Sequence, residues 1–538
     1  MNPTSPGSAA VRAATRPRDA GDLPARYLLE TGPEQDPATV EAAVAGMLAD
    51  LAPEISRLST LDPDVLVVEL PGRTLEGGDP AAAFTAGYLL AEELGLPAAE
   101  PDLPTPYFPE ELVAEPGVPA AESVQDFPPG CWAEHEPALD GDPRWALDRM
   151  RVPQAWAWSM VQGRPSHGAG VIVAQPDTGV TTHAELADVI RAAGFNTLTG
   201  KPDPTDVLSG GNPGHGTGTA SVLISPETPT IVGSAPHAQH MPIRAIESVI
   251  RVTQGSVAQA IDWAVEHGAH VITMSLGGIP SFALHRAIRR AVAADVIVLA
   301  AAGNCVRTVV WPARYEECLA VGGSNAADGM WKGTCRGSAV DIAAPAQNVL
   351  RASVPSGSSQ GQGTSFAVAL TAGVAALWLA HHGRANLIGA ARARGETVPV
   401  MFRRLLQATA RRPATWWPRD LGPGIVDAAA LLAANLDLVR EAELVPPPAD
   451  ARESAAVSIA SLVAEVVGAA AVDDALDWHR YAPELATALL ERRLRMTDPP
   501  AEHPRQPLYS EHLAAAVTNP ALRDALGLDL ELKPAGVS

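Results

Sequence analysis

The chain has 538 residues, which is more than one hydrophobic core usually supports, so the sequence predicts two or three domains. Hydrophobic residues make up 46% of the chain, a share typical of a folded protein and not of a disordered one. The formal net charge is -22, and no cluster of Lys and Arg with interleaved aromatic residues is present, which argues against a nucleic-acid partner.

The sequence also argues against four other classes: disulfide-rich, zinc-binding, secreted and membrane-spanning proteins. Four cysteines in a chain of this length do not make a disulfide framework, and their spacing offers no CxxC pair suited to zinc. The first residues contain arginines but no apolar run long enough for a secretory signal. The longest apolar stretch, 366–380, is too short to span a bilayer. We therefore expect a cytoplasmic protein with no membrane partner, no metal and no other cofactor.

The N-terminal part of the chain predicts a tail, a small domain and a linker. Residues 1–25 are rich in Pro, Ser, Ala and Arg without hydrophobic periodicity, which predicts a disordered tail. Residues 26–105 predict an α+β domain, because an alternating strand at 65–70 precedes a helix over 81–94. Prolines and acidic residues dominate 106–143, which is typical of an extended linker.

The pattern changes over 144–438, where short β-branched runs alternate with Ala-rich helical stretches. Such runs lie at 171–174, 270–274 and 296–299. Buried strands separated by helices indicate an α/β fold, a parallel sheet with helices on both faces. Ligands of such folds bind beyond the carboxyl ends of the strands, so we expect functional residues there.

The C-terminal part predicts an α-helical appendage over 439–538. It follows a Pro-rich break and contains helical patterns at 455–470, 474–496 and 509–526. Its role stays open between a docking module for a protein partner, a scaffold and a stabilising appendage.

Four polar residues of the central domain each follow a strand or open a helix: Asp177 in VIVAQPDTGV, His215 in GHGTGTASVL, Asn304 in AAAGN and Ser365 in GTSFAVALTAG. Each has an ordinary explanation when taken alone. An Asp-Thr-Gly tripeptide is usually a turn, a lone histidine or asparagine is usually structural, and a serine at a helix start is often a cap. Their combination and order point instead to one catalytic site.

The chain resembles the subtilisin-like serine proteases over 145–432. Asp, His and Ser occur in the order of that family, with the asparagine between His and Ser. The resemblance is also carried by the segments WALDRMRVPQAW, VITMSLGG, WPARYEECLAVGGSN, VDIAAP and GIVDAAALL. It implies a subtilisin-like fold and a serine endopeptidase that acts on peptide or protein substrates.

The resemblance also implies roles for particular residues. Ser365 would be the nucleophile, His215 its base, and Asp177 the carboxylate that orients the imidazole. Asn304 would donate a side-chain hydrogen bond to the oxyanion. Two segments would pair with an extended substrate, and one further residue would fill the specificity pocket. In chain order these are Ser275, Leu276, Gly277, Ala301, Ala302, Gly303 and Val310.

Particular residues set the chain apart from the family pattern. Gly218 stands where many members have a second, non-catalytic histidine. The loop at 225–233 and Glu185 offer few oxygen ligands, so we expect no tight calcium site there. A bridge between Cys305 and Cys318 is conceivable, although two reduced thiols are the expectation for a cytoplasmic protein.

Three further alternatives stay open. Residues 26–105 resemble the small α+β propeptides of the family, which implies an intramolecular inhibitor or folding aid that is cut away within the linker. A permanent accessory domain is the alternative. The activity itself has two competing hypotheses: a peptide ligase or transpeptidase, because an amine can intercept an acyl-enzyme, and a catalytically silent fold that binds peptides.

Overall fold

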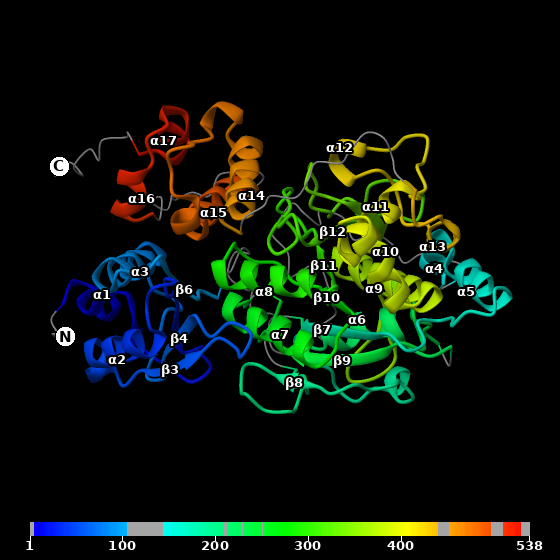
Figure 1. The fold of residues 1–538 in the computed structure, drawn as a ribbon, viewed down its shortest axis with the longest axis horizontal. Coiled ribbons are helices and arrows are strands. Elements are labelled where there is room, and N and C mark those ends of the chain that lie inside the picture. The colour runs from blue at the N-terminus through cyan, green and yellow to red at the C-terminus, as the bar shows by residue number, and fades with distance from the viewer. Residues whose placement is uncertain are drawn as a thin grey trace, which may run out of the picture. The chain divides into compact units, whose positions relative to one another are not determined.

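The chain folds into two compact units in a computed structural model (Figure 1). The structure describes residues 5–104, 142, 144–208, 212–227, 230–249, 251–438, 451–495 and 509–528. The first unit comprises Met1–Pro104, Ile279–Ala283 and Pro448–Ser538, and the second comprises Thr105–Gly278 and Leu284–Pro447. The linker predicted over 106–143 lies outside the described residues, apart from residue 142.

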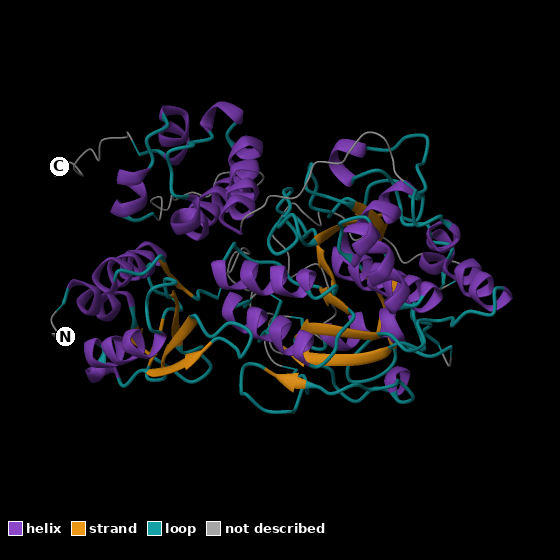
Figure 2. Cartoon of the chain, viewed as in Figure 1, coloured by secondary structure: helices purple, strands orange, loops and turns teal. Residues whose placement is uncertain are grey.

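The second unit is built on a seven-stranded sheet in which all neighbouring strands are parallel. In spatial order the strands are β13 (Ile342–Pro345), β12 (Leu319–Ser324), β11 (Ile297–Ala301), β10 (Val271–Met274), β7 (Ile172–Asp177), β9 (Gln239–Arg244) and β8 (Phe195–Asn196). Residues of β10, β11, β12 and β13 are all buried, as expected for a parallel sheet covered on both faces. The predicted α/β class is confirmed, and Figure 2 shows the strands with helices around them.

The order of the strands reverses beside β7. The chain passes from β7 to β9 on one side and then returns to β10 on the other side of β7. Such a reversal leaves a crevice beyond the carboxyl ends of the strands, because the connecting helices diverge to opposite faces. The carboxyl ends of β7 and β10 are therefore where the topology favours a site.

One face of the sheet packs against α6 (His215–Ile224) and α9 (Thr364–His382), which also contact each other. Helix α7 (Gln254–Glu266) contacts β7 and β9. Gly373 lets α9 approach the Ser234 side chain closely, because a Cβ at this position would meet Ser234 Oγ at 1.9 Å. Among the described residues α9 is the one helix long and apolar enough to cross a membrane by length and composition, and it is wholly buried inside the fold.

The other elements of the second unit lie around this core. The helices are α4 (Trp145–Arg149), α5 (Val152–Val161), α8 (Phe282–Ala293, of which the part from Leu284 on belongs to this unit), α10 (Arg384–Ala393), α11 (Val398–Ala408), α12 (Pro418–Leu421) and α13 (Ala428–Ala433). A hairpin of β14 (Val349–Ala352) and β15 (Ser358–Gly361) precedes α9.

The N-terminal part of the first unit is the predicted α+β domain. Its antiparallel sheet has the order β3 (Glu54–Arg57), β4 (Val65–Leu70), β2 (Ala25–Glu30) and β6 (Ala98–Pro101). Two helices, α2 (Pro37–Met47) and α3 (Pro80–Leu94), accompany it. The strand predicted at 65–70 and the helix predicted over 81–94 are confirmed as β4 and α3.

The prediction of a disordered tail over 1–25 is wrong for the described residues. Pro6–Ala14 form helix α1, and Ser5 caps it by accepting a hydrogen bond from the Ser8 N–H. The helix buries Val11 and packs against α3. Strand β1 (Arg16–Pro17) then pairs with β5 (Arg73–Thr74). The helix was not predicted because residues 1–25 show no hydrophobic periodicity. It is stabilised by its cap and by its contacts with α3.

The C-terminal region is helical, as predicted. It contains α14 (Ala451–Val466), α15 (Trp478–Arg495), α16 (Glu511–Ala516) and α17 (Pro520–Leu526). The single helix predicted over 509–526 is two helices, because Asn519 caps a new helix that starts at a proline.

The N-terminal domain and the C-terminal helices form one unit, whereas the sequence predicted two separate domains. The Tyr88 hydroxyl donates to the Glu484 carboxylate at 2.8 Å, and both side chains are buried. His479 Nε2 lies 2.6 Å from Glu30 Oε2, and α15 also packs against β6. The sequence held no signal for this pairing, because its partners are about 400 residues apart.

Candidate active site

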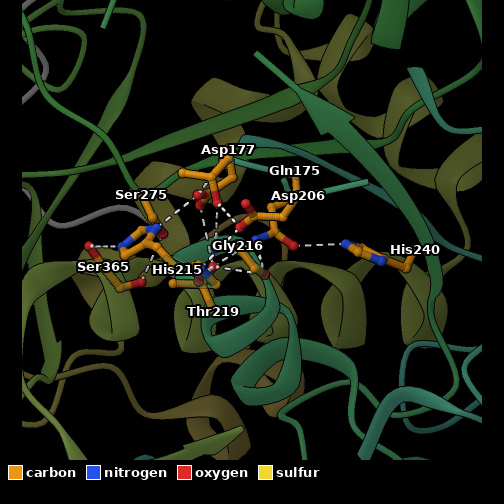
Figure 3. Close-up of polar contacts among 11 residues, drawn as sticks. Gln175, Asp177, Asp206, His215, Gly216, Thr219, His240, Ser275 and Ser365 are labelled. Carbon is orange, nitrogen blue, oxygen red and sulfur yellow. Dashed lines mark hydrogen bonds and ion pairs between the residues drawn. The ribbon is translucent and has the colours of Figure 1, made fainter. Parts of the chain in front are cut away.

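Three of the predicted residues meet beyond the carboxyl end of β7 (Figure 3). Asp177 is the last residue of β7, His215 is the first residue of α6, and Ser365 is the second residue of α9. His215 Nδ1 lies 2.8 Å from Asp177 Oδ1, and His215 Nε2 lies 3.2 Å from Ser365 Oγ. The two ring nitrogens therefore bridge a carboxylate and a hydroxyl.

Glycines allow this close meeting of a strand end and a helix start. Gly214 precedes α6 with a φ of 79°, a left-handed conformation that suits glycine. A Cβ on Gly216 would meet the carbonyl oxygen of Gly179 at 2.1 Å. The small residues that drew attention to GHGTGTA are thus required by the packing of α6 against the turn that follows β7.

The Asp177 carboxylate is buried and held by hydrogen bonds. It accepts from the Thr178 N–H at 2.7 Å, and the Thr219 hydroxyl lies 3.3 Å from its second oxygen. Burial of His215 disfavours the imidazolium, but the charge of Asp177 and the hydrogen bond to it outweigh burial. The pKa of His215 is therefore raised above its ordinary value, and the charge of Asp206 raises it further.

Asp206 is a carboxylate that the sequence prediction missed. Its side chain accepts hydrogen bonds from the Thr178 hydroxyl at 2.7 Å and from the Gly214 N–H at 3.1 Å. Thr178 Oγ1 in turn accepts from the Gly216 N–H. Asp206 thereby joins the turn after β7 to the start of α6. Its place in a Pro- and Gly-rich loop gave no sign of this role, although it shortly precedes His215 in the sequence.

The Asn304 side chain lies beside the start of α9 and has a defined orientation. Its Oδ1 accepts from the Thr364 N–H at 3.0 Å and from the Thr364 hydroxyl at 2.9 Å. The amide nitrogen is directed to Gly363, where it lies 3.5 Å from the position that a Cβ would occupy. With its oxygen engaged, the amide has its N–H groups available next to Ser365.

The two segments predicted to bind substrate also lie at this edge of the sheet. Ser275, Leu276 and Gly277 follow β10, while Ala301 ends β11 and is followed by Ala302 and Gly303. The Ser275 hydroxyl donates to the backbone oxygen of Ser365 at 3.0 Å.

Val310 links the two segments. Its N–H donates to the Ala302 carbonyl at 3.1 Å. A Cβ on Gly277 would lie 2.7 Å from Val310 Cγ2, and one on Gly303 would lie 2.9 Å from the same atom. The isopropyl group of Val310 therefore occupies the space between the two segments.

Two departures from the family pattern can be placed. The Glu185 carboxylate accepts a hydrogen bond from the Ile231 N–H at 3.0 Å, so it bonds to the loop after α6. Cys305 is bonded in a disulfide, whereas Cys318 is a free, buried thiol. The expectation of two reduced thiols is therefore wrong for Cys305, and the two cysteines are not bridged to each other. Cys131 lies outside the described residues.

The fold and the site define the class: an α/β protein in which a serine, a histidine and an aspartate meet beyond the strands of a parallel sheet. The subtilase family model matches residues 168–430. Subtilisin BL of Lederbergia lenta is 34% identical over 236 residues, which are 43% of this chain and 82% of that protein. Thermitase of Thermoactinomyces vulgaris is 33% identical over 246 residues, which are 45% of this chain and 83% of that protein.

A solved protease from Pseudoalteromonas arctica PAMC 21717 is 26% identical, with a TM-score of 0.46, and the match covers 55% of this chain and 98% of that one. The chain belongs to the subtilase family and is a subtilisin-like serine protease. Its substrates are accordingly peptides or proteins.

Proposed function

We propose that the chain hydrolyses peptide bonds through an acyl-enzyme on Ser365. His215 Nε2 takes the hydroxyl proton as Ser365 Oγ bonds to the scissile carbonyl carbon. The tetrahedral intermediate then collapses, the C–N bond breaks, and the imidazolium gives the proton to the leaving amine. Water then attacks the acyl group in the same way, with His215 again taking and returning the proton, and the acid is released from Ser365.

The observation that carries this proposal is the pair of short contacts made by one imidazole. His215 lies 3.2 Å from the Ser365 hydroxyl and 2.8 Å from the buried Asp177 carboxylate. The carboxylate fixes the tautomer with a proton on Nδ1, so Nε2 is free to act as the base. Replacement of Ser365 by alanine should abolish peptide hydrolysis while the protein stays folded.

Asn304 completes the proposed machinery as a donor to the oxyanion. Thr364 engages the amide oxygen, which leaves the N–H groups for an oxygen that becomes negative during the reaction. The Ser365 N–H, in the first turn of α9, is the proposed second donor, because N–H groups there have no partner within the helix.

The proposed substrate is an extended peptide held along Ser275–Leu276–Gly277 and Ala301–Ala302–Gly303. Main-chain pairing of this kind fixes the register of a peptide without reading its sequence. Selectivity would come from the pocket between the segments, where Val310 takes up space. We therefore expect small or medium apolar side chains at the cleaved residue.

An acyl-enzyme on Ser365 can transfer its acyl group to an amine in place of water, and one experiment distinguishes this reaction from hydrolysis. Incubation of the protein with a peptide and an excess of an amine nucleophile, followed by mass spectrometry, separates the two reactions. Hydrolysis yields the acyl fragment as a free acid together with the released amine fragment, whereas a transpeptidase yields the acyl fragment mainly as an amide of the added amine.

A further inference from the structure

A chain of polar side chains lies behind the catalytic carboxylate, and the reaction described above does not use it. It starts with a contact between the exposed Arg191 and His240 on β9. Figure 3 shows its inner part, which runs from His240 through Gln175 on β7 and Thr219 on α6 to Asp177. The three inner side chains are buried. Strand β7 is central in a parallel sheet, where apolar side chains are the ordinary occupants.

Each link of this chain is a short contact. Arg191 Nη1 lies 2.9 Å from His240 Nδ1, and His240 Nε2 lies 2.7 Å from Gln175 Oε1. Gln175 Nε2 lies 2.7 Å from Thr219 Oγ1 and 3.0 Å from the Gly216 carbonyl. A buried polar group without a partner is costly, so these side chains satisfy one another as a set.

The hydrogen bonds of this chain can have only one direction, in which each group donates toward Thr219. A guanidinium only donates, so His240 Nδ1 accepts and the proton of the neutral ring is on Nε2. Burial, together with the charge of Arg191, holds the pKa of His240 well below its ordinary value, so the ring is neutral. Gln175 Oε1 then accepts from His240, which turns the amide N–H groups toward Thr219 and the Gly216 carbonyl.

The Thr219 hydroxyl therefore receives a hydrogen bond and has its own proton to give. Its possible acceptors are Asp177 Oδ2 at 3.3 Å, the His215 carbonyl at 3.0 Å and the Gly216 carbonyl at 3.3 Å. Two of the three belong to the proposed catalytic residues, and the third is the next residue of α6. The chain thus ends on the groups that set the distance between Asp177 and His215.

We propose that Gln175, held by His240 and Arg191, is a positioning residue for the reaction and acts through Thr219. Because Gln175 donates to the Thr219 hydroxyl, that hydroxyl donates its own proton to Asp177 and to the first turn of α6. This contact keeps the distance between the Asp177 carboxylate and the His215 imidazole constant while the imidazole gains and loses its proton. The proposal rests on the proposed function, because it assigns the chain a task in the same proton transfer.

The test compares Thr219→Val, Thr219→Ser and Gln175→Met in the full chain. Removal of a hydrogen bond to a charged group should lower kcat about tenfold in Thr219→Val, with KM unchanged. Without this donor the Asp177 charge acts more strongly on His215, so the acidic limb of kcat/KM should move to higher pH. Thr219→Ser should keep the kcat and the pH profile of the parent protein. In a protein that already carries Thr219→Val, Gln175→Met should lower kcat no further.

Ser225→Ala is the matched control, because this buried hydroxyl lies at the end of α6 and donates to the Glu185 carbonyl, away from the site. It should lower the melting temperature without moving kcat or the pH profile. The proposal is overturned if Thr219→Val behaves like this control, or if Gln175→Met lowers kcat equally with and without the Thr219 hydroxyl.

Titration of His215 by NMR in a Ser365→Ala background gives a readout that does not depend on turnover. Thr219→Val should raise the pKa of His215 there, and an unchanged titration would overturn the positioning role. Loss of the proposed function looks different, because the parent protein itself would then lack hydrolysis. If Gln175→Met does not fold, the comparison of Thr219→Val with Thr219→Ser is sufficient for the test.

Discussion

The single imidazole of His215 determines how the proposed activity depends on pH. Only the neutral ring acts as a base, and Asp177 and Asp206 raise its pKa above the ordinary value of about 6.5. We therefore expect kcat/KM to rise with pH, with a midpoint above about 6.5. Asp206→Asn removes one of the two charges and should move the midpoint to lower pH. A midpoint below the ordinary value, or one that Asp206→Asn raises, would contradict this account of His215.

Val310 determines the size of the proposed specificity pocket. Val310→Gly removes the isopropyl group that lies between Gly277 and Gly303, so preference should move toward Phe or Tyr at the cleaved residue. Cleavage of a peptide library by the parent protein and the variant measures the change. The neighbouring buried Val309 is the control, and Val309→Ala should leave the preference as it is. A parent protein that already cuts best after Phe or Tyr would rule out this placement of Val310.

At the scale of the elements, α9 joins the proposed nucleophile to the core. Gly373→Ala would place a methyl group against Ser234 and should lower the free energy of unfolding by about 1–3 kcal/mol. Gly389 lies in α10, and a Cβ there meets nothing within 4 Å. Gly389→Ala should therefore be neutral or stabilise by about 0.5–1 kcal/mol. Denaturant unfolding of both variants checks the pair, and equal losses of stability would show that the packing of α9 is not the cause.

The elements that the sequence predicted best are those encoded by contiguous patterns. Strands β7, β10 and β11 are short β-branched runs, and each candidate catalytic residue stands at the end of a strand or the start of a helix. Asp206, Gln175 and His240 were missed because only tertiary packing brings them together. Helix α1 was missed because its cap and its contacts with α3 leave no periodic signal, and no sequence pattern marked Cys305 as disulfide-bonded.

At the scale of the whole molecule, the N-terminal domain is proposed as an inhibitor or folding aid that is cut away within 106–143. If so, the purified parent protein should become shorter, while Ser365→Ala stays at full length. We further expect the released domain to stay bound, because Tyr88 and Glu30 contact Glu484 and His479 of the C-terminal helices.

Gel filtration after cleavage tests this expectation. Both fragments should elute together, and Tyr88→Ala should separate them, whereas Glu41→Ala on the surface of the N-terminal domain should not. An intact, active parent chain would identify the domain as a permanent accessory domain. Separation of the fragments in the parent protein would contradict the retention of the cleaved domain.

The central claim is that Ser365 is the nucleophile of a serine protease. The most direct test is reaction of the purified protein with a fluorophosphonate, followed by peptide mapping by mass spectrometry and assay of peptide hydrolysis. The account predicts a single label on Ser365, loss of hydrolysis in step with labelling, and neither label nor hydrolysis in Ser365→Ala. A label on another residue, or unchanged turnover in Ser365→Ala, would contradict it.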